Sequence, residues 1–234
     1  MARRLLLLSN STMPGARPLD HAEAAFRKVL AGARRVLFVP HALDDHAAYA
    51  ARMRERFAAM DVALDALDEG DAPARAIANA EAVYVGGGNT FRLLHALQTH
   101  GWIEPLRARV LGGMPYLGAS AGTNVATRSI QTTNDMPIVQ PPSFAALALV
   151  PFNVNPHYLD PDPDSTHMGE SREQRLREFH EMNDAPVVGL REGSWLEVEG
   201  DRCTLGGTRG ARLFRKGRQP VEHVPGDDLS FLLR

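Results

Sequence analysis

Short apolar runs alternate with amphipathic stretches over the first half of the chain. The runs are rich in Leu, Val, Phe and Tyr and have the length of buried strands, which we expect at 4–8, 35–39, 62–67, 82–85 and 114–117. The stretches between them, rich in Ala, Leu, Glu and Arg, predict helices at about 21–31, 45–59, 72–78, 90–97 and 103–110. This order predicts a doubly wound α/β fold, with a mostly parallel sheet and helices on both faces.

The pattern changes in the last third of the chain. A helix is expected at 173–182, followed by strands at 187–190, 195–198, 203–205 and 211–214. The turn residues at 199–201 join two of these strands as a hairpin. We therefore expect the sheet to end in an antiparallel C-terminal extension. The segment before it, 137–163, is irregular and rich in Pro, Asn and Asp, and long segments of this kind often carry function.

Length and composition narrow the class of protein. The 234 residues contain no repeat or Pro/Gly/Ser-rich linker, so we expect a single domain, 1–234. The 26 Lys and Arg nearly balance the 28 Asp and Glu, which predicts a small-molecule partner and no nucleic acid. The apolar run at 5–8 is too short for a membrane span and lacks the features of a secretory signal. One cysteine, Cys203, in a strand-like run, allows neither an internal disulfide nor a metal cluster and predicts a cytoplasmic location.

Ser120 is the first candidate for chemistry. It lies in the sequence Gly-Ala-Ser-Ala-Gly at 118–122, between a predicted strand and a helix-compatible segment of small residues. Small neighbours let the backbone turn sharply there, so a serine hydroxyl can point into solvent beside free N–H groups at a helix N-terminus. A helix-capping serine in a tight turn would have the same local pattern. The five residues alone leave the nucleophile and the cap as alternatives.

A serine nucleophile needs a base, and His157 is the preferred candidate among the nine histidines. It follows a strand-like run at 150–156 whose last residue is a proline, and this context suits a fixed imidazole. His167 is the alternative. The remaining histidines lie on predicted helices, in loops before the serine or near the C-terminus, where structural roles are expected; these are His21, His41, His46, His95, His100, His180 and His223.

Asp135 is the first candidate for the acid that orients the base. It lies in a short polar stretch between Ser120 and His157, and the chain order Ser, Asp, His occurs in α/β-hydrolases. An Asx turn is its structural alternative. Glu192, just after the strand expected at 187–190, is the second candidate because it also projects from a strand end.

Three consecutive glycines at 86–88 follow the strand expected at 82–85. They lack the Lys-Ser/Thr of a P-loop and the spacing of a dinucleotide site. Backbone N–H groups here could instead bind an oxyanion, and Gly88 and Ala121 are the two predicted donors. A helix N-terminus capped by Asn89 is the structural alternative, and it is compatible with this role.

Four ordered segments, 85–91, 118–124, 155–157 and 169–175, together resemble the peptidase E family of aspartyl dipeptidases over nearly the whole chain. The resemblance implies a class I glutamine amidotransferase-like fold with serine in place of the cysteine of those enzymes. It also implies a cytoplasmic serine peptidase without cofactor or metal. Its substrate would be an Asp-X dipeptide, a small peptide with an N-terminal aspartate.

Carried onto this chain, the resemblance makes Ser120 the nucleophile, His157 the general base and acid, and Asp135 the acidic member, with Glu192 as alternative. It assigns Arg172 to the substrate aspartate, since a guanidinium binds a carboxylate in bidentate geometry. A surface charge ladder is the alternative role for Arg172. Other functions that remain open are a cyanophycinase-like hydrolase, a small esterase and a binding module without activity. We expect no membrane partner and a monomer or weak homo-oligomer.

Overall fold

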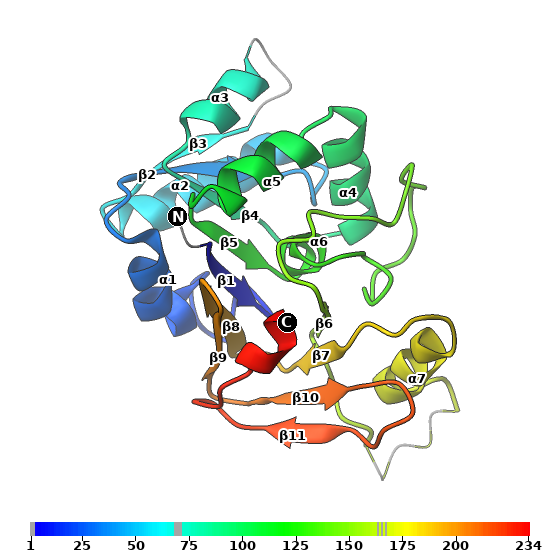
Figure 1. The fold of residues 1–234 in the computed structure, drawn as a ribbon. Helices are drawn as coiled ribbons and strands as arrows, with labels where there is room; N and C mark the ends of the chain where they lie inside the picture. The colour runs from blue at the N-terminus through cyan, green and yellow to red at the C-terminus, as the bar shows by residue number, and fades with distance from the viewer. Residues whose placement is uncertain (1–2, 68–71, 163, 165, 167) are drawn as a thin grey trace.

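The computed structural model describes residues 3–67, 72–162, 164, 166 and 168–234, and its main element is a seven-stranded sheet (Figure 1). The strand order is β3-β2-β4-β5-β1-β8-β9. Strands β1 to β5 run parallel, and β8 and β9 are antiparallel to their neighbours. The strands are β1 (Arg4–Leu8), β2 (Arg35–Val39), β3 (Ala63–Ala66), β4 (Ala82–Val85), β5 (Tyr116–Ala119), β8 (Ser194–Glu199) and β9 (Arg202–Gly207). The mostly parallel sheet predicted from the sequence is confirmed.

A second sheet of four strands has the order β11-β10-β7-β6. Its strands are β6 (Asn153–Pro156), β7 (Val187–Leu190), β10 (Ala211–Phe214) and β11 (Val221–His223). Strands β6 and β7 pair in parallel and the other pairs are antiparallel. The expected antiparallel C-terminal extension of the larger sheet is confirmed and consists of the β8–β9 hairpin, whereas β7 and β10 pair with each other in the second sheet. Strand β11 was not predicted, since its Val221 and Glu222 are both exposed and give no alternation of burial.

Helices cover both faces of the larger sheet, as alternate residues of each strand point to opposite sides. On one face Leu6 and Leu8 of β1 belong to the core formed with α1 and α2, and on the other Leu5 and Leu7 belong to the core formed with α3 to α6. The helices are α1 (Glu23–Leu30), α2 (His46–Ala58), α3 (Pro73–Asn79), α4 (Thr90–Thr99), α5 (Ile103–Leu111), α6 (Ala121–Ala126) and α7 (Arg172–Met182), with 3₁₀ turns at Asp20–Ala22 and Ser230–Leu233. This arrangement confirms the two helical layers.

The two sheets share one hydrophobic core. Val154 of β6 and Val188 of β7 are fully or almost fully buried and belong to the same cluster as Leu5 of β1. The residue after β6, His157, is hydrogen-bonded to the residue after β1, Ser9, so the end of β6 lies at the carboxyl edge of the parallel strands, where open α/β sheets bind ligands.

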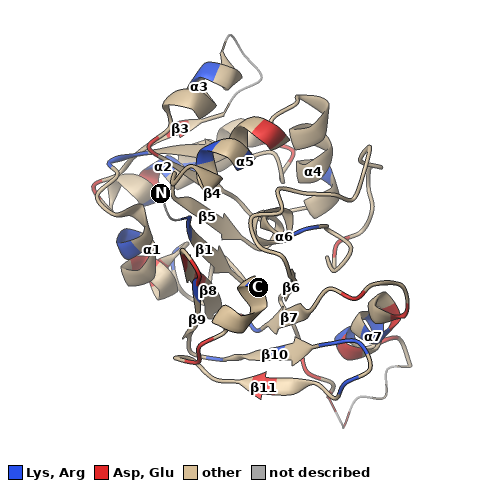
Figure 2. Ribbon diagram, viewed as in Figure 1, with Lys and Arg blue, Asp and Glu red and all other residues tan. Residues whose placement is uncertain are grey.

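Charged residues of both signs are distributed over the molecule in the view of Figure 2, and α7 carries both. Within the described residues, no helix is long and apolar enough to cross a membrane.

Candidate active site

Ser120 occupies a strained turn between β5 and α6. It follows the last residue of β5, and its backbone angles, φ 53° and ψ −107°, are unusual for a residue with a side chain. Its N–H donates to the carbonyl of Leu8 at 3.1 Å. Although Ser120 is at the N-cap position of α6, its side chain makes no capping hydrogen bond. A strand, a strained serine and a helix in this order form the geometry of a nucleophile elbow.

The glycines that flank Ser120 are required by close packing. A Cβ at Gly122 would lie 2.1 Å from the carbonyl oxygen of Val85 in β4, and a Cβ at Gly118 would lie 2.6 Å from the carbonyl oxygen of Gly122. Both distances are far shorter than van der Waals contact. The small residues of this motif therefore allow α6 to lie directly against β4 and β5, which holds Ser120 at the rim of the sheet.

Gly122→Ala is expected to lower the free energy of unfolding by about 3 kcal/mol, because the added methyl group would displace the α6 backbone from Val85. Urea denaturation followed by circular dichroism measures the change. Gly112→Ala is the matched control, because Gly112 has helical backbone angles at the end of α5 and the nearest atom to an added Cβ is 3.1 Å away. Equal stability losses for the two variants would contradict the packing argument.

His157 links Ser120 to an acidic residue. Its Nε2 is 2.9 Å from Ser120 Oγ and its Nδ1 is 2.6 Å from Oε1 of Glu192. The residue directly follows β6, and its φ of 52° is in the left-handed region. An imidazole with a hydroxyl on one nitrogen and a carboxylate on the other is the arrangement by which serine hydrolases activate their nucleophile.

Ser9 holds the backbone of His157 and was missed in the sequence analysis. Its Oγ accepts a hydrogen bond from the N–H of His157 at 2.9 Å and donates to the carbonyl of Leu190 at 2.8 Å. The side chain therefore ties the segment after β6 to the end of β7. The sequence contained one signal for it: Ser9 directly follows β1, so it lies at the same carboxyl edge as Ser120.

The structure places Glu192, and not Asp135, against the base. Asp135 Oδ2 accepts hydrogen bonds from the N–H of Thr90 at 2.7 Å and from Thr133 Oγ1 at 3.1 Å. The geometry thus favours the second sequence candidate over the first as the partner of His157. Asp135 is fixed instead at the N-terminus of α4, where the helix dipole favours a negative charge.

Asp135 nevertheless lies at the same pocket as the serine. A pocket of about 380 Å³ is lined by Ser120, Asn124, Thr133, Asn134, Asp135, Pro156, His157 and Arg172. Asn134 Nδ2 donates to the carbonyl of Pro156 at 2.7 Å and so joins the loop carrying Asp135 to the end of β6. A pocket of this size accommodates a small ligand and contains one acidic and one basic side chain beside the serine–histidine pair.

Arg172 begins α7 and is half-buried at this pocket. Burial lowers the pKa of its guanidinium, Arg175 acts in the same direction, and Asp135 opposes them; an arginine stays protonated in all cases. Among the residues that the structure describes, no carboxylate forms an ion pair with Arg172. The charge ladder considered above involves its neighbours: Arg177 pairs with Glu173, and Arg175 with Glu170 at 3.4 Å.

The glycine turn after β4 lies beside Ser120. A Cβ at Gly87 would be 3.3 Å from the Cβ of Ser120, and Gly88 has a φ of 138° that favours glycine. Ala121, the second predicted donor, is the first residue of α6, where a helix leaves its N–H groups without intrahelical acceptors. Asn89 caps α4 by accepting a hydrogen bond from Arg92 N at 3.0 Å, so helix capping coexists with this arrangement.

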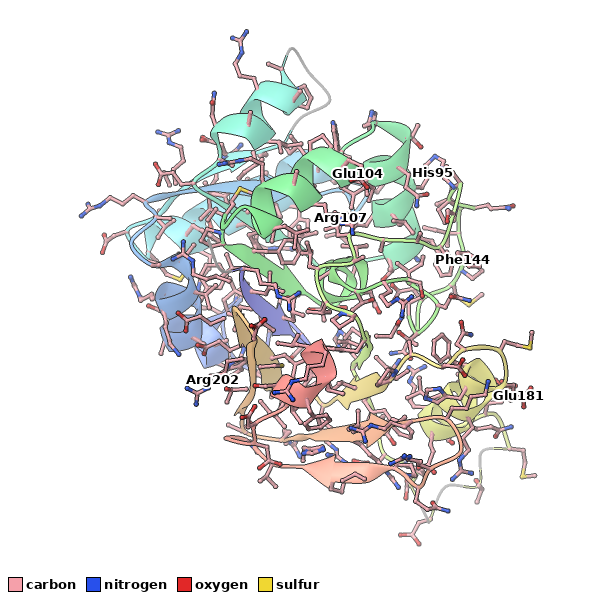
Figure 3. All side chains as sticks on the ribbon, viewed as in Figure 1. His95, Glu104, Arg107, Phe144, Glu181 and Arg202 are labelled. Atoms are coloured by element: carbon pink, nitrogen blue, oxygen red, sulfur yellow. The ribbon has the colours of Figure 1, made fainter. Side chains whose placement is uncertain are left out.

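The other candidate side chains lie elsewhere. His95 is on α4 (Figure 3), and His167 is outside the described residues. Burial lowers the pKa of His41 to about 4, and its ring is 4.4 Å from that of His46, yet within the described chain no group of three or more side chains is arranged to hold a metal ion. Burial raises the pKa of the Cys203 thiol to about 12, so this thiol is a poor nucleophile at neutral pH.

Comparisons with protein-family models and curated proteins found matches over most or all of the chain. The model of peptidase family S51 matches residues 5–206. Peptidase E of Streptomyces coelicolor is 58% identical over 98% of this chain and 94% of its own length. A probable alpha-aspartyl dipeptidase of Drosophila melanogaster is 48% identical over 100% of this chain and 98% of its own length.

Solved structures support the fold. The crystal structure of a peptidase from an acI-B1 Actinobacterium has a TM-score of 0.74 over 99% of this chain and 98% of that chain, at 18% sequence identity. A putative peptidase E from Listeria monocytogenes has a TM-score of 0.67 over 88% of this chain and 99% of that chain, at 21% identity.

The full-length relatives confirm the resemblance to peptidase E and the prediction of a hydrolase of the serine peptidase type. They also remove the alternative of a binding module without activity. The chain belongs to peptidase family S51.

Proposed function

We propose that this protein is a serine dipeptidase that hydrolyses Asp-X dipeptides, with residues 1–234 acting as one catalytic unit. The observation that carries the proposal is the line of hydrogen bonds from Glu192 Oε1 through His157 to Ser120 Oγ, with contacts of 2.6 and 2.9 Å. The substrate class is supported by the name alpha-aspartyl dipeptidase of the Drosophila relative, which matches the whole chain.

The reaction starts at the serine. His157 Nε2 takes the proton of Ser120 Oγ, and Oγ forms a bond to the carbonyl carbon of the substrate aspartate. Glu192 stabilises the imidazolium that results. The imidazolium then gives its proton to the nitrogen of residue X as the peptide bond breaks. In the second half of the cycle, His157 deprotonates a water molecule, which attacks the ester carbon; the imidazolium then returns the proton to Ser120 Oγ as the ester bond breaks and aspartate leaves.

The oxyanion of each tetrahedral intermediate is assigned to the N–H groups of Gly88 and Ala121. Two features support the assignment: the glycine turn lies beside Ser120, and Ala121 begins α6. Backbone donors on a turn held by close packing require little reorganisation as the negative charge develops.

Arg172 is assigned to the side-chain carboxylate of the substrate aspartate. It lines the pocket of Ser120 and His157 and has no carboxylate partner among the described residues. A half-buried guanidinium that forms no ion pair with a described carboxylate favours an anionic ligand, and its fork geometry matches a carboxylate.

Asp135 is assigned to the α-ammonium group of the substrate, in place of the orienting role expected from the sequence. Both hydrogen bonds to its carboxylate use Oδ2, so Oδ1 accepts none from the described residues, and the side chain lines the pocket. Opposite charges on Asp135 and Arg172 complement the ammonium and carboxylate groups of an N-terminal aspartate. A cyanophycinase-like hydrolase or an esterase would not require a free ammonium group at this position.

Hydrolysis of Asp-Leu, Asn-Leu, Glu-Leu and N-acetyl-Asp-Leu by the wild type and by Arg172→Met tests the proposal. The wild type is expected to prefer Asp-Leu. Arg172→Met is expected to lose about a hundredfold in kcat/KM for Asp-Leu and little for Asn-Leu, because two charge-assisted hydrogen bonds are lost.

Arg175→Met is the control, since it removes an exposed arginine one turn along α7 and should change kcat/KM less than about threefold. An unchanged preference for Asp over Asn in Arg172→Met would remove Arg172 from the carboxylate site. Faster cleavage of N-acetyl-Asp-Leu than of Asp-Leu by the wild type would refute the dipeptidase proposal.

We also propose a cytoplasmic location, because a single buried cysteine fits a reducing compartment.

A further inference from the structure

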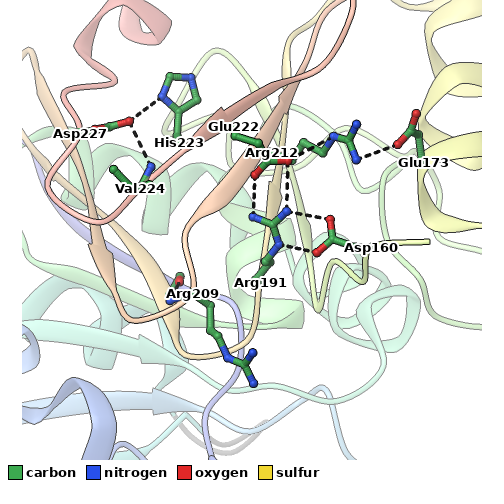
Figure 4. A network of polar contacts seen from close by, with 10 residues as sticks. Asp160, Glu173, Arg191, Arg209, Arg212, Glu222, His223, Val224 and Asp227 are labelled. Atoms are coloured by element: carbon green, nitrogen blue, oxygen red, sulfur yellow. Dashed lines mark hydrogen bonds and ion pairs between the residues drawn. The ribbon is translucent and has the colours of Figure 1, made fainter. Parts of the chain in front are cut away.

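A chain of ion pairs with alternating charge joins strands of the second sheet to the segments that carry His157, Glu192 and Arg172 (Figure 4). Its members are Asp160, Arg191, Glu222, Arg212 and Glu173. They come from the segment after β6, the end of β7, strands β10 and β11, and the first turn of α7. The serine mechanism uses none of these side chains, so their arrangement has no explanation in the catalytic steps themselves.

Arg191 lies at the centre of this chain of ion pairs. Its Nε and Nη2 donate to the two carboxylate oxygens of Asp160, both at 2.7 Å, and its Nη1 and Nη2 donate to those of Glu222 at 2.9 and 3.2 Å. Two bidentate pairs on one guanidinium fix its position in two directions. The hydrogen bond from Arg191 lowers the pKa of the Asp160 carboxyl, so the pair is fully charged at neutral pH.

The Asp160–Arg191 pair joins the same two segments as the catalytic hydrogen bond. Asp160 is three residues after His157, and Arg191 immediately precedes Glu192. The backbones of these segments run side by side, since Pro156 and Leu190 are in register between β6 and β7. The ion pair therefore continues the contact between the segments just beyond the point where His157 meets Glu192.

The catalytic hydrogen bond needs such support. The side chains of His157 and Glu192 are 40% and 50% exposed, so water competes for both partners. The left-handed backbone of His157 also has a conformational cost that the surrounding structure must offset.

The other end of the chain of ion pairs lies at the start of α7. Arg212 Nη1 is 3.0 Å from Oε2 of Glu173, which is buried and directly follows Arg172. The same ion pairs thus connect the segment that orients the base with the residue proposed to bind the substrate side chain.

We infer that Arg191 is a positioning residue whose bidentate pair with Asp160 holds Glu192 against His157. The inference rests on the proposed serine mechanism, but not on the identity of the dipeptide. Neither Arg191 nor Asp160 lines the pocket that contains Ser120; they act through the orientation of the Glu192–His157 hydrogen bond.

The test compares Asp160→Asn, Asp160→Glu and Arg191→Lys, each in the wild type and in a Glu192→Gln background. In the wild type, Asp160→Asn is expected to lower kcat for Asp-Leu by about 10- to 100-fold with little change in KM, because a misplaced base slows the chemical step. Asp160→Glu keeps the carboxylate and should recover most of the rate. Arg191→Lys keeps the positive charge but not the planar fork of the guanidinium, and its kcat should be intermediate.

In the Glu192→Gln background, Asp160→Asn is expected to lower kcat further by less than about twofold, because the interaction it supports is already lost. Equal losses in both backgrounds would overturn the inference and indicate a general structural role. Lys216→Met is the control; it removes a pair with Asp184 at 2.9 Å beyond β10 and should leave kcat unchanged.

A second measurement separates this inference from the proposed substrate. The rate at which a serine-directed fluorophosphonate labels Ser120 reports activation of the nucleophile without any dipeptide. Slower labelling of Asp160→Asn than of wild type is expected, and equal rates would refute the positioning role. Normal labelling of a wild type that fails to cleave Asp-Leu would refute the substrate and leave the positioning role in place.

Discussion

Ser120→Ala is expected to lower kcat for Asp-Leu by about 10⁶-fold, because no other group can form the acyl-enzyme. The pocket itself should survive. Asp135 and Arg172 retain their places, and alanine removes an oxygen that is hydrogen-bonded to His157 Nε2 at 2.9 Å. The Kd of the inactive variant for Asp-Leu should therefore stay within about threefold of the wild-type KM. Steady-state kinetics and isothermal titration calorimetry measure the two quantities.

Ser143→Ala is the matched control for this substitution. Ser143 is exposed on the loop before β6, where its Oγ accepts a hydrogen bond from the N–H of Ala145 at 3.1 Å, and loss of this hydroxyl should leave kcat unchanged. Turnover at the wild-type rate by Ser120→Ala would refute the nucleophile assignment.

Glu192→Gln and Asp135→Asn are expected to lower activity in different ways, the first through kcat and the second through KM. Glu192→Gln should lower kcat for Asp-Leu by about 10³-fold, since an amide keeps the shape of the side chain but cannot stabilise the imidazolium. Asp135→Asn should instead raise KM for Asp-Leu by about tenfold with a smaller loss of kcat, since it removes the charge opposite the substrate ammonium.

N-acetyl-Asp-Leu provides the control for this comparison, because it has no ammonium group to lose. Its slow cleavage should be reduced by Glu192→Gln and hardly affected by Asp135→Asn. If Asp135→Asn lowers kcat as severely as Glu192→Gln, Asp135 takes part in orienting the base and the ammonium assignment fails.

Local sequence signals predicted the elements of the larger sheet well. The strands at Arg4–Leu8, Arg35–Val39 and Ala82–Val85 have the bounds expected from their apolar runs. Strand β5 was expected at 114–117 and is at Tyr116–Ala119, because Gly118 and Ala119 continue the strand despite their small size. Burial between two helical layers makes strands visible as continuous apolar runs, so such strands are easily recognised.

The second sheet could not be predicted from these local signals. Strands β7 and β10 were recognised as strands, yet nothing local distinguishes pairing with β6 from pairing with β9. The choice depends on which apolar faces meet in the shared core, where Val188 packs with Val154. Strand pairing is a property of the folded chain and is only weakly encoded in each strand alone.

The sequence by itself determined the α/β architecture, the family resemblance and the serine, histidine and arginine candidates, because strand burial, glycine turns and motif spacing act over a few residues. Only the tertiary structure decided which acid meets the base. His157 and Glu192 are 35 residues apart and become hydrogen-bonded because β6 and β7 pair in parallel register. Asp135 is nearer to His157 in sequence, but it is hydrogen-bonded to the N-terminus of α4. The Arg191 ion pairs were hidden for the same reason, since their partners come from segments that meet only when the second sheet is formed.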